Sequence, residues 1–539
     1  MVRMVVWLMA LATIAMGQAE RWVHRYNGPG NGDDYAYAAV YGADGNIYVA
    51  GYSTGSGTGE DFTVISLTPT DSERWVYRCN GSGNGDDAAY SLVFGPDSNI
   101  YAVGTSSDSG TGTDFTVISL TPAGTERWVY RYDGPGDSAD GGNDLVYAAD
   151  GNIYAAGGSR GSGTGNDFTV ISLTPAGSER WVHRYNGPGN ANDYAMRLIY
   201  GADGNIYAAG YSTGIDSGWA CTVISLTPAD SERWVYRYSG PGIGYYYATS
   251  LVYGADGSIY LAGSSMGIAN NSDFTVISLT PAGSERWVYR YNGPGNGDDE
   301  AYSLGYGADG NIYAAGGCVD SVTDYDLTVI SLTPADSERW VYRYNGPANS
   351  WDLAYSMVCG PDGNIYAAGL SPGMGTAGDL AVASLTPDGS QRWVYRYDGP
   401  GLNDDAANSV VYGGDGYVYA AGSSRGIGTG YDIAVISLDP ALGVAEGRPR
   451  KARPTPGLMA ASVQNRVLTY TMKLAEPVTV SLSLYDLQGR RAAGWQLRAP
   501  AGTSQYTQSL SMLSSGVYFL SAGVSGRNQT ERRKLTVLR

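Results

Sequence analysis

The chain has 539 residues, too many for one hydrophobic core, so we expect more than one domain. The formal charge is −18, but residues 446–539 carry 14 basic and 4 acidic side chains, which leaves 20 basic and 48 acidic ones for the rest. An acidic main body repels phosphate backbones, which argues against a nucleic acid as partner.

Residues 1–19 have the three parts of a secretory signal peptide. Arg3 supplies the positive start, residues 4–16 form a short apolar run, and Gly17-Gln18-Ala19 supplies small residues for cleavage. We therefore predict cleavage between Ala19 and Glu20. The apolar run is too short to span a bilayer comfortably and no later stretch qualifies, so we expect an exported protein without a transmembrane span after signal removal.

Residues 20–440 consist of one unit that repeats every 53 residues, without insertion or deletion. A period of about 50 residues indicates a solenoid, a propeller or an array. The tryptophan that marks the unit occurs eight times, at Trp22, Trp75, Trp128, Trp181, Trp234, Trp287, Trp340 and Trp393.

Each unit predicts four antiparallel strands and no helix, because apolar residues alternate at a period of two. Asp44-Gly45, between the first two strands, is a strong hairpin signal, since both turn positions need positive φ. Four strands per unit is typical of a propeller blade. In the first complete unit the expected strands are 35–41, 46–52, 61–67 and 73–79.

The two ends of the repeat array indicate a closed ring. The mature chain begins with a lone fourth strand at 20–26, and the last unit ends with its third strand at 432–438. The first strand is therefore expected to complete the last blade of an all-β, eight-bladed propeller. The alternative, an open solenoid, would need caps on both terminal faces, and the sequence offers none.

Several segments of the unit are similar to a known repeat. Gly-Asn-Gly-Asp-Asp (30–34), Gly-Ala-Asp-Gly-Asn-Ile-Tyr-Ala-Ala-Gly (201–210) and Ser-Glu-Arg-Trp-Val-Tyr-Arg-Tyr (231–238) resemble the bacterial seven-bladed β-propeller repeat family. The resemblance implies an exported propeller, mostly without assigned activity in that family, although this chain has eight copies. The turn at 174–181 is also similar to the Trp-docking repeat of quinoprotein dehydrogenases, but no basic cofactor pocket is visible.

Beyond a basic, Pro-rich linker at 441–457, residues 458–539 predict a small β-sandwich of six strands. Residues 484–490, 500–502, 515–519 and 533–539 resemble, in order, the motifs of the C-terminal sorting domain of the type IX secretion system. The resemblance implies passage through the periplasm, recognition by the type IX machinery, and release or attachment at the cell surface. The alternative is an ordinary accessory β-domain. The expected strands are 466–474, 478–485, 492–497, 505–510, 516–522 and 530–538.

Two series of aspartates flank the long Gly-rich loops, which a propeller places on one face. They could form a ring of carboxylates for Ca²⁺ or a cationic ligand, or each could cap its loop by accepting backbone N–H groups. We expect caps and no cofactor, because the Asp-x-Asp-x-Asp-Gly spacing of calcium loops is absent. The first series is Asp34, Asp87, Asp140, Asp193, Asp299, Asp352 and Asp405, and the second is Asp61, Asp114, Asp167, Asp273, Asp326, Asp379 and Asp432.

Each aspartate series lapses once, in neighbouring repeats, where Ala220 and a tyrosine stand instead. Exposed aromatic residues there could stack on sugar rings or pack on a surface protein, and random drift of one copy is the alternative. Trp351, alone in its loop, is a weaker candidate of the same kind. The candidate ligand patch consists of Trp219, Tyr245, Tyr246 and Tyr247.

The sequence does not assemble a catalytic site. His24 and His183 replace a tyrosine of the other repeats and are expected to be packed, and Gly55–Gly59 precedes a strand rather than a phosphate-binding helix. We therefore predict an extracellular binding or scaffold module; the alternative is a surface lyase or hydrolase acting on polysaccharide through loop-face carboxylates. Neither a disulfide nor a metal site is expected from the four scattered cysteines, Cys79, Cys221, Cys318 and Cys359.

Overall fold

The computed structural model describes residues 19–215, 218–242, 244–267, 271–401, 403–441, 457–464, 467–474, 478–485, 491–499, 502–510, 513, 516–524 and 530–537. Nearly all of the predicted signal peptide and linker lies outside these residues. Within them every regular element is a β-strand, and no helix is long and apolar enough to cross a membrane. The chain divides into two compact units, Met1–Val444 and Ala445–Arg539.

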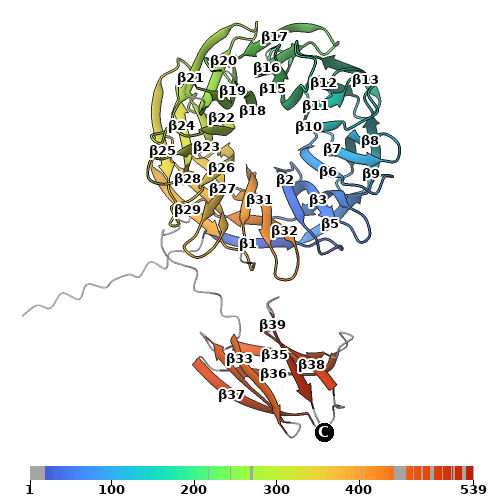
Figure 1. Cartoon of the computed structure of the whole chain (residues 1–539), viewed down its shortest axis with the longest axis vertical. Coiled ribbons are helices and arrows are strands. Elements are labelled where there is room, and N and C mark those ends of the chain that lie inside the picture. The colour runs from blue at the N-terminus through green and yellow to red at the C-terminus, as the bar shows by residue number, and fades with distance from the viewer. Residues whose placement is uncertain are drawn as a thin grey trace, which may run out of the picture. The chain divides into compact units, whose positions relative to one another are not determined.

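The first unit is a closed ring of eight four-stranded antiparallel sheets (Figure 1). In blade 1 the order from the centre outward is β2 (Asp34–Tyr41), β3 (Ile47–Thr54), β4 (Glu60–Leu67) and β5 (Glu73–Cys79). The following blades are numbered in chain order and have the same topology. The predicted all-β, eight-bladed propeller is therefore confirmed.

The remaining blades take their two inner strands from equivalent repeat positions. The innermost strands are β6 (Ala88–Phe94), β10 (Gly141–Tyr147), β14 (Tyr194–Tyr200), β18 (Tyr246–Tyr253), β22 (Glu300–Tyr306), β26 (Leu353–Cys359) and β30 (Asp405–Tyr412). The second strands are β7 (Ile100–Asp108), β11 (Ile153–Arg160), β15 (Ile206–Thr213), β19 (Ile259–Met266), β23 (Ile312–Val319), β27 (Ile365–Pro372) and β31 (Val418–Arg425).

The outer half of each blade follows the same rule, and only blade 8 takes its last strand from elsewhere in the chain. The third strands are β8 (Gly112–Leu120), β12 (Asn166–Leu173), β16 (Trp219–Leu226), β20 (Ser272–Leu279), β24 (Tyr325–Leu332), β28 (Gly378–Leu385) and β32 (Tyr431–Leu438). The outermost strands are β9 (Glu126–Tyr132), β13 (Glu179–Tyr185), β17 (Glu232–Tyr238), β21 (Glu285–Tyr291), β25 (Glu338–Tyr344) and β29 (Gln391–Tyr397).

The first strand of the chain, β1 (Glu20–Tyr26), closes the ring as expected. It pairs antiparallel with β32, from Trp22 opposite Ser437 to Tyr26 opposite Ile433. An ion pair of 2.6 Å between Arg25 Nη2 and Asp432 Oδ2 joins the same two strands. Because β1 completes blade 8, this sheet leaves no unpaired strand edge at the junction of the chain ends.

Each innermost strand contains a β-bulge that the sequence did not reveal. In blade 1 the register between β2 and β3 shifts between Ala36 and Ala38. At the bulge the two backbones approach closely, and a Cβ atom on Gly51 would lie 1.8 Å from the carbonyl oxygen of Tyr35. Only glycine fits there, which explains why the unit keeps this residue.

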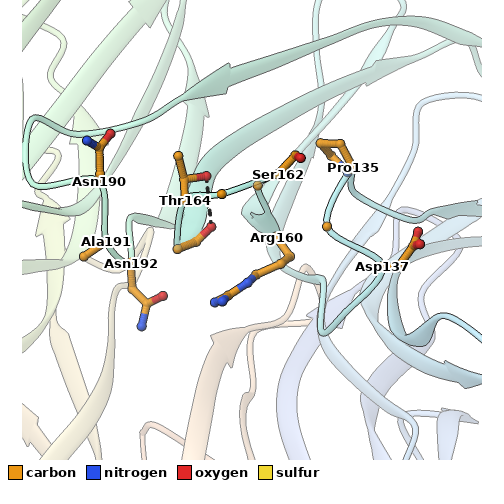
Figure 2. Close-up of a pocket in the computed structure, with 12 residues that line it drawn as sticks. Pro135, Asp137, Arg160, Ser162, Thr164, Asn190, Ala191 and Asn192 are labelled. Carbon is orange, nitrogen blue, oxygen red and sulfur yellow. Dashed lines mark hydrogen bonds between the residues drawn. The ribbon is translucent and has the colours of Figure 1, made fainter.

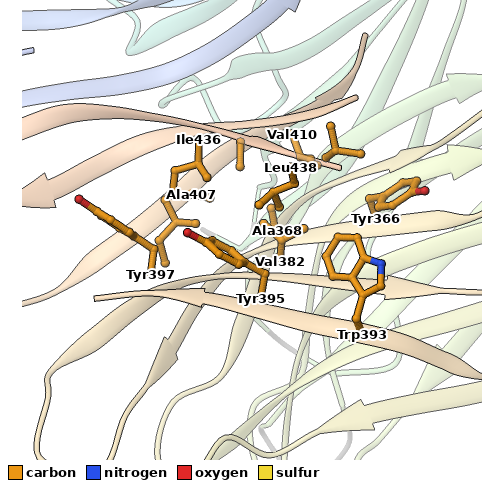
Figure 3. Packing of buried hydrophobic residues seen from close by; sticks show 13 residues of the cluster. Tyr366, Ala368, Val382, Trp393, Tyr395, Tyr397, Ala407, Val410, Ile436 and Leu438 are labelled. Atoms are coloured by element: carbon orange, nitrogen blue, oxygen red, sulfur yellow. The ribbon is translucent and has the colours of Figure 1, made fainter. Parts of the chain in front are cut away.

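The hydrophobic core lies between neighbouring blades. Figure 3 shows the cluster between blades 7 and 8, where Tyr366, Val382 and Trp393 of one blade pack with Ala407 and Ile436 of the next. Alanine on the inner strands leaves room for these large aromatic rings. Each blade therefore buries its faces only against its two neighbours, and the ring must close for every face to be covered.

The short turns and the long loops lie on opposite faces of the ring. We call the face with turns such as 42–46 and 68–72 the turn face, and the face with loops such as 27–33 and 55–59 the loop face. On the turn face Asp44 Oδ2 accepts a hydrogen bond of 2.6 Å from Tyr48 Oη. Burial acts to raise the pKa of Asp44, but the hydrogen bonds from Tyr48 and Asn46 outweigh burial and lower the pKa.

Contacts between blades on the turn face repeat around the ring. Trp22 Nε1 donates to the carbonyl oxygen of Pro69 at 2.9 Å, and Trp75 Nε1 donates to that of Pro122 at 3.0 Å. The same bond reaches the proline of the following blade from the other tryptophans of the series, Trp128, Trp181, Trp234, Trp287, Trp340 and Trp393.

The second unit contains two small antiparallel sheets that share one core. Leu468 and Tyr470 of one sheet cluster with Val480, Leu482 and Leu484 of the other. The sequence predicted all of its strands except the first, β33, which begins at the last residue of the predicted linker and ends before the first expected strand. The sheets are β33 (Gly457–Gln464), β34 (Val467–Leu474) and β37 (Gly502–Ser509), and β36 (Arg491–Ala499), β35 (Val478–Tyr485), β38 (Gly516–Val524) and β39 (Thr530–Val537).

Candidate functional site

The first aspartate series lies beneath the loop face and caps the loops. Asp34 accepts hydrogen bonds from Gly28 N at 2.7 Å and Thr54 N at 2.9 Å. Burial raises its pKa to about 6, although these two bonds act in the opposite direction. The capping prediction is therefore confirmed for this series. The N–H group six residues earlier donates in the same way to Asp87, Asp140, Asp193, Asp299, Asp352 and Asp405.

These seven carboxylates are 0–2% exposed, so a substrate on the loop face cannot reach them. Their raised pKa values come from burial rather than from a partner placed for proton transfer. The polysaccharide-cleaving alternative would therefore need carboxylates from outside this series.

Six of the seven aspartates of the second series form an ion pair with arginine, and the prediction of backbone caps is wrong for them. Asp61 Oδ2 lies 2.5 Å from Arg78 Nη2, and its other oxygen accepts a bond of 3.0 Å from Thr58 Oγ1. The arginine comes from the paired outer strand β5, where Arg78 lies opposite Thr63 of β4. Equivalent pairs are Asp167–Arg184, Asp273–Arg290, Asp326–Arg343, Asp379–Arg396 and Asp432–Arg25.

Tyr246 does not belong to an exposed patch, and that part of the prediction is wrong. Its side chain is 1% exposed, and its hydroxyl lies 3.0 Å from Gly242 N and 3.0 Å from the carbonyl oxygen of Met266. The tyrosine thus occupies the place of the capping aspartate and serves the loop backbone with a neutral hydroxyl group. Burial raises its pKa, as it does for Tyr247, whose ring is half-buried beside Glu300.

Trp219 of blade 4 and Tyr245, in the loop that leads from blade 4 to blade 5, do lie together on the loop face, and they are part of a longer row. Trp219 stacks on Tyr211 with ring centroids 4.2 Å apart and an interplanar angle of 17°. Tyr245 meets Trp219 edge-on at 4.6 Å and is 54% exposed. Tyr194 continues the row, 5.6 Å from Tyr211. We call Tyr194, Tyr211, Trp219 and Tyr245 the aromatic row.

Tyr194 and Tyr211 were not among the residues predicted from the sequence. Trp219 lies on β16 opposite Thr213 of β15, two residues along from the pair of Tyr211 and Cys221. Side chains two residues apart on a strand share one face, so the hairpin register alone places Trp219 beside Tyr211. Pairing the two strands of this hairpin residue by residue would have placed Trp219 beside Tyr211 from the sequence.

A wide cavity of about 740 Å³ opens on the loop face over blade 3, next to the aromatic row. Three loops line it, at 135–137, 160–165 and 190–192, and their side chains are mainly polar. Figure 2 shows the side chains of Arg160 and Asn192 extending into the space between these loops.

Two asparagines connect the cavity to the aromatic row. Asn166 N donates to Asn192 Oδ1 at 3.1 Å, and the Asn166 side-chain amide donates to Tyr194 Oη. Asn192 lines the cavity, whereas Tyr194 belongs to the aromatic row. The two features therefore form one continuous surface across blades 3 and 4.

Trp351 stands apart from this surface, on the loop face between blades 6 and 7. It is 54% exposed, its indole N–H donates to Asp324 Oδ2, and its ring meets Tyr325 edge-on at 6.2 Å. It has one aromatic neighbour instead of a row.

The two histidines join blades. His24 Nδ1 lies 3.0 Å from Asp71 Oδ1, and His183 Nδ1 lies 3.0 Å from Asp230 Oδ1. In other blades a tyrosine occupies this position, as in the bond of 2.6 Å from Tyr236 Oη to a glutamate. Both histidines thus replace one contact between blades with another. The four cysteines are free, and burial raises the pKa of the Cys221 thiol to about 12.

A position on the innermost strands joins the blades around the centre of the ring. Ser250 Oγ accepts a hydrogen bond of 3.0 Å from Leu304 N of the next blade. At the same position Asp144 accepts bonds from Ser91 Oγ at 2.9 Å and Leu198 N at 2.8 Å, and burial raises its pKa. Asp144 was not predicted from the sequence, and its contacts join neighbouring blades.

No family model and no curated protein matches the chain. Among solved structures, it is similar to a protein of unknown function from Dyadobacter fermentans, with 11% identity, a TM-score of 0.34, and coverage of 78% of this chain and 98% of the other. A eukaryotic initiation factor gives 12% identity and a TM-score of 0.36, covering 67% of this chain and 88% of that one. The aldose sugar dehydrogenase of Escherichia coli gives 11% and 0.28, with 55% and 95% covered. Likenesses this distant carry no argument about activity or ligand.

Proposed function

We propose that the protein is an exported binding module that recognises a glycan on the loop face of blades 3 and 4. The observation that carries this proposal is the aromatic row, which ends in the exposed ring of Tyr245. Aromatic rings offer apolar faces on which the C–H faces of sugar rings stack. Such rings serve as anchors when they are held rigidly, and Trp219 is held between Tyr211 and Tyr245.

The cavity beside the row supplies the polar half of such a site. Sugar hydroxyl groups both donate and accept hydrogen bonds, and Arg160, Asn190 and Asn192 offer amide and guanidinium groups around the cavity. A volume of about 740 Å³ is in the range of binding pockets and leaves room for more than one sugar unit. A protein partner with exposed sugar chains would use the same contacts.

Binding is tested with the purified full chain against a panel of polysaccharides and cell-surface extracts. We expect Trp219→Ala and Tyr245→Ala each to weaken binding about tenfold or more. Trp351→Ala removes an equally exposed aromatic residue from another part of the same face and should leave binding unchanged. Absence of binding to every glycan, or equal losses for Trp219→Ala and Trp351→Ala, would refute the proposal.

We also propose that the second unit directs export to the cell surface through the type IX machinery. The support is the order of the matching segments in residues 484–539, together with the separation of this unit from the propeller at Val444 and Ala445. In a bacterium that carries the machinery, deletion of residues 466–539 should retain the propeller in the periplasm. Normal surface delivery of the truncated chain would favour the ordinary accessory domain.

A further inference from the structure

Three carboxylates converge where blade 2 meets blade 3. Asp114 lies on β8, Asp133 follows β9, and Asp140 precedes β10, and one oxygen of each lies within 4.8 Å of the others. Asp114 is 4% exposed and Asp140 is 2% exposed, so two of the three are withdrawn from solvent. Calcium binds carboxylate oxygens at about 2.4 Å, so two ligands of one ion lie at most about 5 Å apart.

Asp114 differs from the rest of its series in having no arginine within ion-pair distance, although the charge of Arg131 still acts to lower its pKa. Among the described residues it is the one member of the second aspartate series without an ion pair to arginine. Its Oδ1 atom is buried and has no hydrogen-bond partner, as in Asp379 and Asp432, but each of those two has an arginine on its other oxygen. A buried, unpartnered carboxylate oxygen is costly, because it has lost its water without gaining another partner.

The missing ion pair coincides with a substitution in the preceding blade. In blade 3, Arg184 donates to Tyr132 Oη at 3.3 Å and pairs with Asp167 at 2.7 Å. The equivalent residue in blade 2 is Arg131, and the tyrosine is replaced by Cys79. Arg131 is exposed, and its Nη2 atom lies 3.9 Å from Cys79 Sγ. The guanidinium of Arg131 therefore lacks the hydroxyl contact that accompanies the ion pair in blade 3.

The junction of blades 7 and 8 is an internal control. It also has three aspartates at these repeat positions, Asp379, Asp398 and Asp405. There Arg396 Nη2 lies 2.6 Å from Asp379 Oδ2, so a guanidinium already supplies the positive charge. Only at the junction of blades 2 and 3 are three carboxylates combined with a displaced arginine in the described part of the ring.

We propose that Asp114, Asp133 and Asp140 bind a divalent cation, Ca²⁺, which takes the place of the displaced Arg131. Three carboxylates offer a hard, oxygen-only ligand set, and Ca²⁺ tolerates their irregular geometry better than Mg²⁺ does. Burial raises the pKa of Asp114 against the effect of the nearby Thr111 hydroxyl, and the ion would favour the charged form. Asp133 and Asp140 also frame the loop whose Pro135 and Asp137 line the cavity, so the ion would hold one cavity wall.

Calorimetric titration of the chelator-treated full chain with CaCl₂ tests this site, and MgCl₂ serves as the competing ion. Asp133→Asn, which installs the residue found at this position in five other repeats, should weaken Ca²⁺ binding about tenfold or more. Cys79→Tyr restores the hydroxyl contact of Arg131 and should also abolish binding, although it alters no ligand. Asp398→Asn is the matched control and should bind as the unchanged protein does.

Each outcome of this titration decides the proposal. It is supported if Asp133→Asn and Cys79→Tyr lose Ca²⁺ and Asp398→Asn keeps it, with thermal unfolding showing that all three variants fold. It is overturned if the unchanged protein binds no Ca²⁺ at millimolar concentration, if Mg²⁺ binds instead, or if Asp133→Asn has no effect. Ion binding is measured without any glycan, so failure here is distinct from failure of the proposed function.

Discussion

The pKa values of Asp44 on the turn face and Asp34 on the loop face are shifted in opposite directions. On the turn face, hydrogen bonds from Tyr48 and Asn46 overcome the effect of burial and lower the pKa of Asp44. On the loop face, burial dominates and raises the pKa of Asp34 to about 6. The turn face repeats its contacts from blade to blade, whereas the loop face loses a carboxylate at Ala220 and an arginine contact at Asp114. The turn face therefore holds the ring together, and the loop face is where repeats can acquire new roles.

Opening the ring is the most drastic way to break this comparison, because both faces depend on closure. Deleting residues 20–26 removes β1 and its ladder with β32, and it exposes a strand edge. We expect a loss of more than about 5 kcal/mol in the free energy of unfolding, with aggregation. Calorimetry and gel filtration measure both effects. A synthetic peptide of residues 20–26 should restore part of the stability, and an unchanged thermal transition would contradict closure by β1.

On the turn face, Trp234→Ala should destabilise the protein without affecting glycan binding. The indole N–H donates to the carbonyl oxygen of Pro281 at 3.0 Å, and the ring lies 5.8 Å from that of Tyr207. Removing a large aromatic side chain from such packing costs about 3 kcal/mol. Chemical denaturation measures this loss. A fall in binding affinity without a fall in stability would reverse the roles we assign to the two faces.

On the loop face of the same blade, Trp219→Ala should behave in the opposite way. Its ring is half-buried and stacks on Tyr211, so we expect a loss of stability of about 1 kcal/mol or less. Binding to the selected glycan should fall about tenfold or more. Denaturation and binding assays on Trp219→Ala and Trp234→Ala together form a matched pair within blade 4. Similar stability losses in the two variants would remove the distinction between the faces.

The pH dependence of stability should separate the two groups of aspartates. Six carboxyl groups of the first series have a pKa raised from 3.8 to about 6, so the folded protein binds their protons more tightly than the unfolded chain. Their stabilising contribution to the free energy of unfolding is therefore complete below pH 3.8 and is lost as the pH rises through about 6. Turn-face aspartates such as Asp44 have a pKa lowered from 3.8, so the stabilisation that they provide is lost only as the pH falls below 3.8.

We therefore expect the melting temperature to be higher at pH 5 than at pH 7 and to fall again in stronger acid. Repeating the scans in about 0.5 M salt is the control, because salt screens repulsion between surface charges but not the burial of Asp34 and its equivalents. A melting temperature that falls steadily from pH 7 to pH 5 would contradict the raised pKa values.

The smallest effect is expected for His183→Tyr. Tyrosine at this position donates to a glutamate of the next blade elsewhere in the ring, as Tyr236 does to Glu285 at 2.6 Å. Exchanging one partly exposed contact between blades for another should change the free energy of unfolding by less than about 1 kcal/mol. A larger loss, or a loss of glycan binding, would give the histidine a role beyond joining blades.

The sequence predicted the architecture because the same pattern is written eight times and each copy supports the others. The closing role of β1 followed from counting strands. Tyr246 was misplaced because a tyrosine that replaces a buried aspartate looks like an exposed aromatic residue until its hydroxyl is seen to cap the loop. The role of Arg78 was missed because it depends on the register between β4 and β5, which one repeat does not reveal.

Hydrogen exchange of the full chain, with and without the glycan that binds most tightly, tests the division of roles most directly. We predict protection of loop-face peptides around 135–137, 190–194 and 211–219, while peptides containing the turns at 42–46 and 68–72 remain unchanged. Protection confined to the turn face, or spread evenly over all eight blades, would contradict the assignment of binding to the loop face of blades 3 and 4.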